Sequence, residues 1–264
     1  MKTGFFQDRV AIVTGASKSI GRATALELAR RGAHLCLASR DAAGMGQTAD
    51  RVRACGREAL AVQTDVTDLE QVQALADRAI EHYGRVDILV ANAGIYVRKP
   101  LAQLDIATLQ HSMATNFYGA AGCVLAILPH MLERGSGRIA LVSSFAGKKA
   151  LPGDAPYACA KFALNALGEA MRQELAPQGI YTSLILPGRV DTDLVLGLKL
   201  PRIQPPIPAE SVARAIANAI QHRRAEVIVP GRVLGLYYLN AIHPRLGDWV
   251  VRLFHLQGWE ELGS

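Results

Sequence analysis

The chain has 264 residues, of which 50% are hydrophobic and 20% charged, so it can form a sizeable core and does not have the composition of a disordered protein. The 29 Lys and Arg against 23 Asp and Glu give a net charge of +6, but these basic residues are spread out without interleaved aromatic residues, which argues against nucleic-acid binding and fits an anionic cofactor or lipid. The four cysteines form no CxxC pair and are expected to be reduced and buried. The sequence has neither a signal peptide nor an uninterrupted apolar run of about 18 residues, so the expected location is cytoplasmic.

Short apolar segments alternate with segments of helical apolar spacing along most of the chain. The predicted strands are residues 10–14, 34–38, 59–63, 86–90, 138–142, 180–186 and 227–229. The predicted helices are residues 20–31, a polar stretch between the second and third strands, and residues 69–83, 104–132, 156–175 and 209–221. This alternation predicts an α/β fold, a single doubly wound Rossmann-type domain whose parallel sheet is covered by helices on both faces.

The turn after the first predicted strand reads Thr14-Gly15-Ala16-Ser17-Lys18-Ser19-Ile20-Gly21. A glycine-bearing turn between an apolar strand and a helix is what a dinucleotide pyrophosphate needs, because the backbone can approach closely and the helix N-terminus favours negative charge. By itself, such a turn is equally well a tight connection between strand and helix.

A tyrosine and a lysine occur one helical turn apart in Tyr157-Ala-Cys-Ala-Lys161. Residues four apart lie on the same face of a helix, so the lysine ammonium can stabilise a tyrosinate and make the phenol a proton donor and acceptor near neutral pH. A Tyr-x-x-x-Lys pair without further support is more often a half-buried aromatic residue with a satisfied hydroxyl.

Together and in this order, the two motifs resemble those of the short-chain dehydrogenase/reductase family, a group of single-domain nicotinamide-dependent oxidoreductases. The resemblance covers roughly residues 8–230. It implies that Tyr157 donates a proton to the substrate, and that Lys161 lowers the tyrosine pKa and bonds the nicotinamide ribose. It also implies that Ser144 holds the substrate oxygen, in preference to Ser143, and that Asn116 positions a water that relays protons.

The resemblance also implies the cofactor contacts. In the first turn, Gly15 and Gly21 take the first and third glycine places, and Ser19 stands where the middle glycine is usual. Later segments resemble those that contact the adenine ring, support the sheet beside the cofactor and bind the nicotinamide amide. The implied contacts are Gly15, Ser17, Lys18, Ser19, Ile20, Gly21, Arg40, Asp65, Val66, Asn92, Ala93, Gly94, Tyr157, Lys161, Pro187, Gly188, Val190 and Thr192.

The end of the second strand predicts which nicotinamide cofactor binds. Ser39 stands where the family's NAD enzymes usually have Asp, and Arg40 and Lys18 are cations suited to the 2′-phosphate of NADP. Asp41 argues weakly for NAD but more plausibly caps the following helix. Although Arg40 alone could be a solvated surface residue, the two cations together predict NADP.

The predicted activity is that of an NADPH-dependent reductase, or in reverse an alcohol dehydrogenase, which interconverts a ketone and a secondary alcohol. The leucine-rich residues 194–200 lie where the family folds a lid, which favours a lipophilic small molecule such as a 3-oxoacyl, ketosphingoid-like or steroid-like ketone, unless these leucines only pack the lid onto the core. The alternatives are a reductase of polar substrates and a non-catalytic NADP-binding regulator or scaffold. The seven His have no ligand spacing, so no metal site is expected.

The last residues differ from the rest in composition. We expect residues 1–230 to form the dinucleotide-binding and catalytic domain, and residues 231–264 to be an apolar, aromatic and basic tail of the same domain. Residues 233–239 and 249–254, with Arg232, Arg245 and Arg252 interspersed, are suited to peripheral membrane contact, or else pack on protein. The apolar helices 104–132 and 156–175 predict a homodimer or homotetramer, as is usual in the family.

Overall fold

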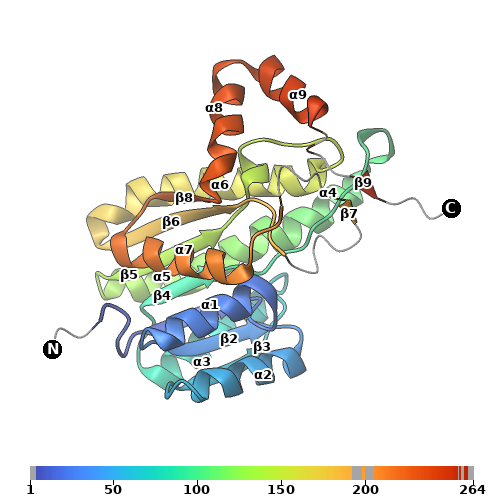
Figure 1. Cartoon of the computed structure of the whole chain (residues 1–264). Helices are drawn as coiled ribbons and strands as arrows, with labels where there is room; N and C mark the ends of the chain where they lie inside the picture. The colour runs from blue at the N-terminus through green and yellow to red at the C-terminus, as the bar shows by residue number, and fades with distance from the viewer. Residues whose placement is uncertain (1–3, 192–197, 200–204, 255, 257–258, 261–264) are drawn as a thin grey trace.

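The computed structural model of the chain describes residues 4–191, 198–199, 205–254, 256 and 259–260. Figure 1 shows a central sheet with helices on both faces and a pair of helices that projects near the C-terminal end. The sheet has seven strands in the order β3-β2-β1-β4-β5-β6-β8, and every neighbouring pair is parallel. The predicted doubly wound α/β fold is therefore confirmed.

The strands of this sheet lie close to their predicted positions. They are β1 (Val10–Thr14), β2 (His34–Ser39), β3 (Ala59–Gln63), β4 (Ile88–Ala91), β5 (Gly137–Val142), β6 (Ile180–Pro187) and β8 (Glu226–Val229). Only β4 is displaced, because the Val86 N–H donates to Nε2 of His130 (3.2 Å) instead of joining the ladder. A second, two-stranded antiparallel sheet pairs β7 (Leu198–Lys199) with β9 (Trp259–Glu260).

Two apolar cores lie on opposite faces of the sheet, because side chains alternate along each buried strand. In β1, Val10 and Ile12 face one core, whereas Ala11 and Val13 face the other. The first core is covered by α3 (Leu69–Tyr83), α5 (Gly119–Glu133) and α6 (Ala155–Leu175), and α4 (Ile106–Met113) packs on α6. The second core is covered by α1 (Ser19–Arg30), α2 (Ala42–Arg53) and α7 (Ala209–His222).

The predicted helix 104–132 is wrong in one respect, because it is interrupted. A π-helical turn, η2 (Ala114–Tyr118), separates α4 from α5. Gly119 then starts α5 against Val66, where an added Cβ would lie 2.7 Å from Val66 Cγ2, so the widened turn accommodates this close approach. By length and composition the run Ile106–Glu133 could cross a membrane. However, Cys123, Ile127 and Met131 bury their side chains in the first core, so this run is a core helix.

Aspartates start several of the helices. Asp41, Asp68 and Asp105 accept hydrogen bonds from the free backbone N–H groups of the first turns of α2, α3 and α4. This finding confirms Asp41 as a helix cap. The cysteines are all free, but only Cys36 and Cys123 are buried. The expectation of buried thiols is thus wrong for Cys55 and Cys159, because these two lie at an exposed turn after α2 and on the outer side of α6.

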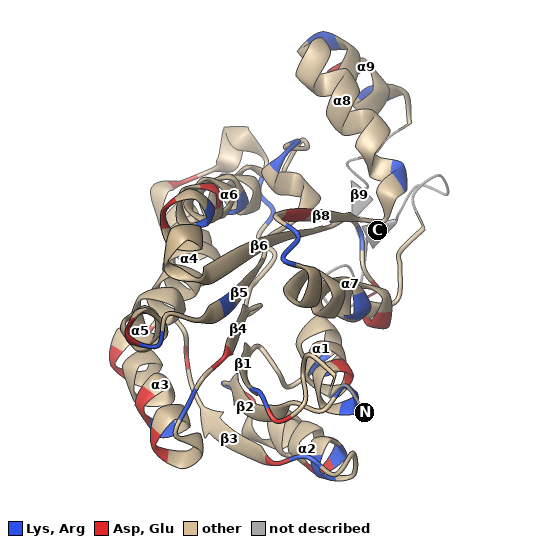
Figure 2. Ribbon diagram, turned by 90° about the vertical axis from the view of Figure 1, so that its left-hand side faces the viewer, with Lys and Arg blue, Asp and Glu red and all other residues tan. Residues whose placement is uncertain are grey.

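The C-terminal residues form a helical hairpin of α8 (Leu234–Ile242) and α9 (Pro244–Leu253), which Figure 2 shows standing off the sheet. A small apolar cluster of Phe145, Val233, Leu236, Val251 and Leu256 attaches the hairpin to the loop after β5. An ion pair from Lys149 to Asp248 joins the same two regions, and Lys148 of the same loop pairs with Glu226 of β8. The hairpin is therefore anchored beside the carboxyl ends of β5 and β8.

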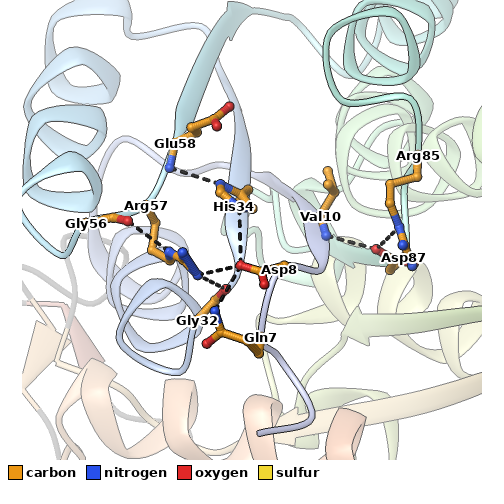
Figure 3. Close-up of polar contacts among 10 residues, drawn as sticks. All are labelled: Gln7, Asp8, Val10, Gly32, His34, Gly56, Arg57, Glu58, Arg85 and Asp87. Atoms are coloured by element: carbon orange, nitrogen blue, oxygen red, sulfur yellow. Dashed lines mark hydrogen bonds and ion pairs between the residues drawn. The ribbon is translucent and has the colours of Figure 1, made fainter. Parts of the chain in front are cut away.

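At the opposite, amino edge of the sheet, a buried carboxylate ties two strands together (Figure 3). Asp87, which is 3% exposed, accepts hydrogen bonds from the Val10 N–H (2.9 Å) and from Nε of Arg85 (2.9 Å). Nη2 of Arg134 lies 3.3 Å away. Burial raises the pKa of Asp87, but the bonds from Arg85 and Val10 and the charge of Arg134 outweigh it and hold the pKa below its usual value.

We predict that Asp87→Asn lowers the free energy of unfolding by about 2 kcal/mol, the scale of hydrogen bonds to a charged group. Because the folded-state pKa lies below the unfolded value of about 3.9, this contribution is complete above about pH 4 and is lost as the pH falls through the folded-state pKa. Urea unfolding at several pH values measures both effects. Asp50→Asn is the control, because Asp50 is 78% exposed in its pair with Arg53. A pH-independent difference between the parent and Asp87→Asn would contradict the assignment.

Candidate active site

A cavity of about 650 Å³ opens at the carboxyl edge of the sheet, where ligands bind in open parallel α/β folds. Loops that follow β1, β2, β3, β4, β5 and β6 contribute to its wall. Its lining includes the four expected catalytic residues, Asn116, Ser144, Tyr157 and Lys161. It also includes every expected cofactor contact except Thr192, which lies outside the described residues. The fold thus brings the predicted site residues together, while their roles stay predictions.

The first turn is built so that a backbone can approach it closely. Gly15 has a φ of +66°, and a Cβ added to Gly21 would lie 2.0 Å from the Gly15 carbonyl oxygen. Only glycine fits at position 21, because that clash is with backbone. Nε of Arg22 donates to Oγ1 of Thr48 (3.2 Å), which itself donates to the Ala16 carbonyl (3.0 Å), so two residues that the sequence motif does not include hold the turn.

Ser19 adopts a backbone conformation suited to glycine. Its φ of +50° lies in the left-handed region, which L-residues other than glycine adopt at a cost of roughly 1–2 kcal/mol. The middle place of the turn therefore keeps its conformation although the glycine is replaced. Replacing the usual glycine with Ser19 therefore strains the backbone locally but does not change the conformation of the turn.

At the end of the cavity formed by the loops after β2 and β3, which the resemblance implies as the adenosine end, a cation follows β2 and a carboxylate follows β3. Oγ of Ser39 donates to Oγ of Ser17 (3.0 Å), and a serine hydroxyl carries no charge. Nη1 of the exposed Arg40 lies 3.6 Å from Oδ2 of Asp65, whose pKa is lowered by the Thr67 backbone N–H and, less strongly, by Arg40. Asp41 is used in its helix cap. Lys18 also lines this end, so the wall combines two cations with Asp65.

Asn116 sits in the π-helical turn and holds the segment after β4. Its Nδ2 donates to the Ile95 carbonyl (2.9 Å) and to the Ser112 carbonyl (3.1 Å), and its Oδ1 accepts from the Ile95 N–H (3.1 Å). A Cβ added to Gly94 would lie 2.8 Å from this Oδ1, so the position of the Asn116 amide leaves little room for a side chain at residue 94. Because Nδ2 and Oδ1 of Asn116 both have partners, a water bound at this residue would bond to the Asn116 backbone.

Tyr157, Lys161 and Ser144 meet beside the end of β5. Nζ of Lys161 donates to the Val142 carbonyl (3.0 Å) and lies 5.6 Å from the centre of the Tyr157 ring. Burial lowers the Lys161 pKa to about 8 and raises the Tyr157 pKa to about 12. A hydrogen bond from Ser144 opposes the rise at Tyr157, and the Asp154 carboxylate adds to it. The lowering of the tyrosine pKa by Lys161 stays a prediction.

The two neighbouring serines have different surroundings. Oγ of Ser143 is buried and donates to the Lys161 carbonyl (3.3 Å), which gives it a structural partner. Oγ of Ser144 accepts from the Ala146 N–H (3.1 Å), which leaves its proton available to Tyr157 or to a ligand. This geometry favours Ser144 over Ser143, as expected.

The sequence motifs did not predict a polar cluster beside Tyr157. The Tyr96 ring packs edge-on against the Tyr157 ring, with centres 5.0 Å apart, and its hydroxyl donates to Oδ1 of Asp154 (2.8 Å). Nε of Arg98 lies 3.1 Å from the same oxygen, and the Arg189 charge also acts on Asp154. The available signals were the position of Asp154 just before the Tyr157 helix and of Arg189 just after Pro187-Gly188.

Within residues 4–191, 198–199, 205–254, 256 and 259–260, no group of three or more His, Cys, Asp and Glu side chains is arranged to hold a metal ion.

Comparisons with known proteins agree with this geometry. A family model described as short chain dehydrogenase matches residues 9–200. The chain is 35% identical over 224 residues to the ketoacyl reductase HetN of Nostoc sp., with 84% of this chain and 78% of that protein covered.

Two solved structures are similar throughout the fold. One is a short-chain dehydrogenase/reductase from Burkholderia phymatum in complex with NAD, with a TM-score of 0.82, 29% identity and coverage of 91% of this chain and 95% of that one. The other is an alcohol dehydrogenase from Thermococcus sibiricus complexed with 5-hydroxy-NADP, with a TM-score of 0.77, 26% identity and coverage of 84% and 96%. One neighbour therefore holds NAD and the other an NADP derivative.

We predict that Ser19→Gly raises the free energy of unfolding by about 1 kcal/mol, because glycine adopts a φ of +50° without the Cβ penalty. Urea unfolding measures the change. Ser211→Gly in α7 is the control, and it should lower the free energy of unfolding by about 0.5 kcal/mol or more, because glycine disfavours an ordinary helix and the exposed hydrogen bond from Arg214 to the Ser211 hydroxyl is lost. A loss of stability in Ser19→Gly would show that the hydroxyl contributes more than the strain costs.

Proposed function

Because the chain belongs to the short-chain dehydrogenase family, we propose that it is an NADPH-dependent reductase that interconverts a ketone and a secondary alcohol. One observation carries this proposal: Ser144, Tyr157 and Lys161 meet on the wall of the same cavity that the glycine turn borders. A proton donor therefore lies where a bound dinucleotide would end.

The residues present fit a nicotinamide dinucleotide. Gly15 and Gly21 lack side chains, so the backbone of the turn can approach a pyrophosphate at the start of α1. Lys161 and the segment Pro187-Gly188 border the other end of the cavity, where they would hold the ribose and the amide. When bound, the nicotinamide ring would supply or take up a hydride.

The residues of this chain would stabilise and protonate the carbonyl oxygen of the substrate. Reduction builds negative charge on that oxygen, so a hydrogen bond from Ser144 and a proton from Tyr157 lower the barrier. In this role Lys161 compensates the negative charge left on Tyr157, and burial strengthens the interaction between the two groups. The backbone of Asn116 would position the water that returns the proton.

The preference for NADP rests on charge at the adenosine end. Lys18 and Arg40 border it, and the end of β2 carries Ser39 where an NAD site has a carboxylate. A guanidinium suits a 2′-phosphate because its planar donors match phosphate oxygens.

An apolar wall supports a lipophilic substrate. Ile95, Phe145, Leu151 and Val233 line the cavity near Tyr157. Most of the expected leucine-rich lid, residues 194–197 and 200, lies outside the described residues. A 3-oxoacyl, ketosphingoid-like or steroid-like ketone fits such a wall, and a similar protein bears the name ketoacyl reductase.

The second candidate is a non-catalytic NADP-binding regulator or scaffold. The presence of Asn116, Ser144, Tyr157 and Lys161 in one cavity argues against it, since cofactor binding alone does not require Ser144. NADPH binding without turnover on any ketone would favour this second candidate.

Exposed apolar side chains support self-association. Ile106, Tyr118, Leu125 and Phe162 of the α4–α6 region are between 45% and 68% exposed in the single chain. Large apolar groups gathered on one helical layer are typical of a subunit interface. We therefore propose a homodimer or homotetramer that buries these helices.

The α8–α9 hairpin supports peripheral membrane contact of a cytoplasmic enzyme. Its exposed apolar side chains are Tyr238, Leu239, Ile242, Leu246, Trp249, Leu253 and Phe254, and the most exposed is Ile242 at 82%. The exposed Arg245 and Arg252 add positive charge to the same hairpin. Aromatic and basic residues on a short hairpin match the chemistry of an anionic lipid surface.

We predict that Tyr157→Phe keeps the fold and NADPH binding but lowers kcat for ketone reduction by at least 100-fold, because general acid catalysis is lost. NADPH absorbance with a panel of ketones measures turnover, and circular dichroism checks the fold. Tyr181→Phe is the control, because this tyrosine bonds Arg223 at the amino edge of the sheet. Activity of Tyr157→Phe above a tenth of the parent would refute the role.

We predict that the parent binds NADPH more tightly than NADH, and that Arg40→Ala weakens NADPH binding by at least tenfold through the loss of a charge-assisted bond. NADH binding should change by less than about threefold, since NADH has no 2′-phosphate. Titration of cofactor fluorescence gives both constants, and the exposed Arg51→Ala is the control. Equal affinity of the parent for the two cofactors would overturn the preference.

We predict that the parent co-sediments with vesicles containing anionic lipid, and that the double variant Ile242→Asp/Trp249→Asp loses about tenfold in partitioning because apolar burial is replaced by charge. Leu101→Asp is the matched control, since Leu101 is 76% exposed but lies outside the hairpin. Light scattering of the same samples reports their mass. A variant that changes in mass and not in lipid binding would assign the hairpin to a subunit interface.

A further inference from the structure

Arg189 places a positive charge on the wall of the cavity. It follows Pro187-Gly188 at the end of β6 and lines the same cavity as Ser144 and Tyr157. Its Nη2 donates to the Leu256 carbonyl. Its Nη1 is buried and, among the residues that the structure describes, has no hydrogen-bond partner. Because Nη1 is buried, a ligand in the cavity meets the positive charge of Arg189 and not this donor.

The surrounding charges leave this corner positive. Asp154 is the carboxylate that the Arg189 charge acts on, but it already accepts from the Tyr96 hydroxyl (2.8 Å) and lies 3.1 Å from Nε of Arg98. Lys149, which also lines the cavity, is paired with Asp248. Two guanidinium groups therefore share one carboxylate, and in the described part of the chain no carboxylate lies within ion-pair distance of Arg189.

This positive corner is separate from the cofactor's phosphate end. Arg40 follows β2 and Arg189 follows β6, and in the sheet order β2-β1-β4-β5-β6 these two strands are four spacings apart. At about 4.8 Å per spacing, the strand ends lie about 19 Å apart, beyond the reach of one side chain. Tyr96, whose hydroxyl bonds Asp154, packs on the ring of Tyr157 itself. The charge of Arg189 is thus on the side where the substrate would lie.

We propose that Arg189 binds a carboxylate of the substrate, so that the substrate is an oxo acid with an apolar skeleton. The inference rests on the proposed reductase function and narrows its substrate class. A carboxylate in the cavity compensates the charge of the guanidinium, while Phe145, Leu151 and Val233 cover the apolar part. A free oxo acid satisfies Arg189, a neutral steroid leaves it unpaired, and a ketosphingoid ammonium is repelled.

The test compares oxo acids with their methyl esters. A series from 3-oxooctanoate to 7-oxooctanoate varies the separation of carbonyl and carboxylate, and each ester removes only the charge. In the parent, kcat/KM for the best acid should exceed that for its ester by at least tenfold, the effect of one charge-assisted hydrogen bond. The measured quantity is this acid-to-ester ratio, which cancels general effects on turnover.

Two variants separate charge from anchoring of the C-terminal segment. Arg189→Gln keeps an amide donor for the Leu256 carbonyl but removes the charge, so its acid-to-ester ratio should fall to about one. Arg189→Lys keeps the charge without the planar fork and should retain part of the ratio. Arg232→Met is the control, because Arg232 bonds the Pro205 carbonyl in the same region and is exposed.

A second measurement does not depend on turnover. Octanoate should raise the Tm of the parent more than octanamide does, and Arg189→Gln should remove the difference. If inorganic sulfate raises the Tm as much as octanoate does, the corner is an adventitious anion site only, and the proposal is overturned.

The outcomes distinguish a failure of the carboxylate site at Arg189 from a failure of the reductase function. Equal reduction of acids and esters by the parent would overturn the role of Arg189 and leave the reductase function intact. If NADPH reduces no ketone, the reductase function fails, and the Tm difference between octanoate and octanamide decides whether Arg189 is a carboxylate site. An unchanged acid-to-ester ratio in Arg189→Gln would also overturn the proposal.

Discussion

In a parallel sheet that is buried on both faces, all strands begin at one edge and end at the opposite edge. In this protein the polar groups at these amino and carboxyl edges have different roles. At the amino edge, Asp87 is surrounded by the Val10 N–H, Arg85 and Arg134, so that strand ends and charges satisfy one another. At the carboxyl edge the strands instead open into loops that leave a cavity, and ligand-binding groups gather there. Ion pairs within the protein therefore satisfy the polar groups at the amino edge, whereas the polar groups at the carboxyl edge are available to a ligand.

Burial also determines the electrostatics of the cavity. Tyr157 and Lys161 lose hydration together, so the tyrosine pKa rises to about 12 and the lysine pKa falls to about 8. Both shifts favour the neutral forms of the two groups, which makes a proton held on Tyr157 the resting state. Positive charge is placed at two distant corners, with Lys18 after β1 and Arg40 after β2 at one corner and Arg189 after β6 at the other.

The C-terminal hairpin is joined to the part of the cavity around Arg189 by residues that line the cavity. Lys149 joins the cavity wall to Asp248 of α9, and Arg189 joins it to the Leu256 carbonyl. Val233 belongs both to the wall and to the apolar cluster that anchors the hairpin. The hairpin is therefore attached to the cavity wall around Lys149, Arg189 and Val233.

Local patterns in the sequence determined the α/β alternation, the bounds of β1, β3 and α3, the glycine turn and the Asp41 cap, because hydrophobic period, propensity and caps involve residues close in the chain. Tertiary structure alone decided the π-helical turn within 104–132, which forms where Asn116 binds Ile95 and Gly119 meets Val66. It also decided the cluster of Tyr96, Arg98, Asp154 and Arg189, whose members come from separate segments and become neighbours only when the ends of β4, β5 and β6 are paired. No short-range pattern encodes such contacts, since their energy depends on groups that folding brings together across the sheet.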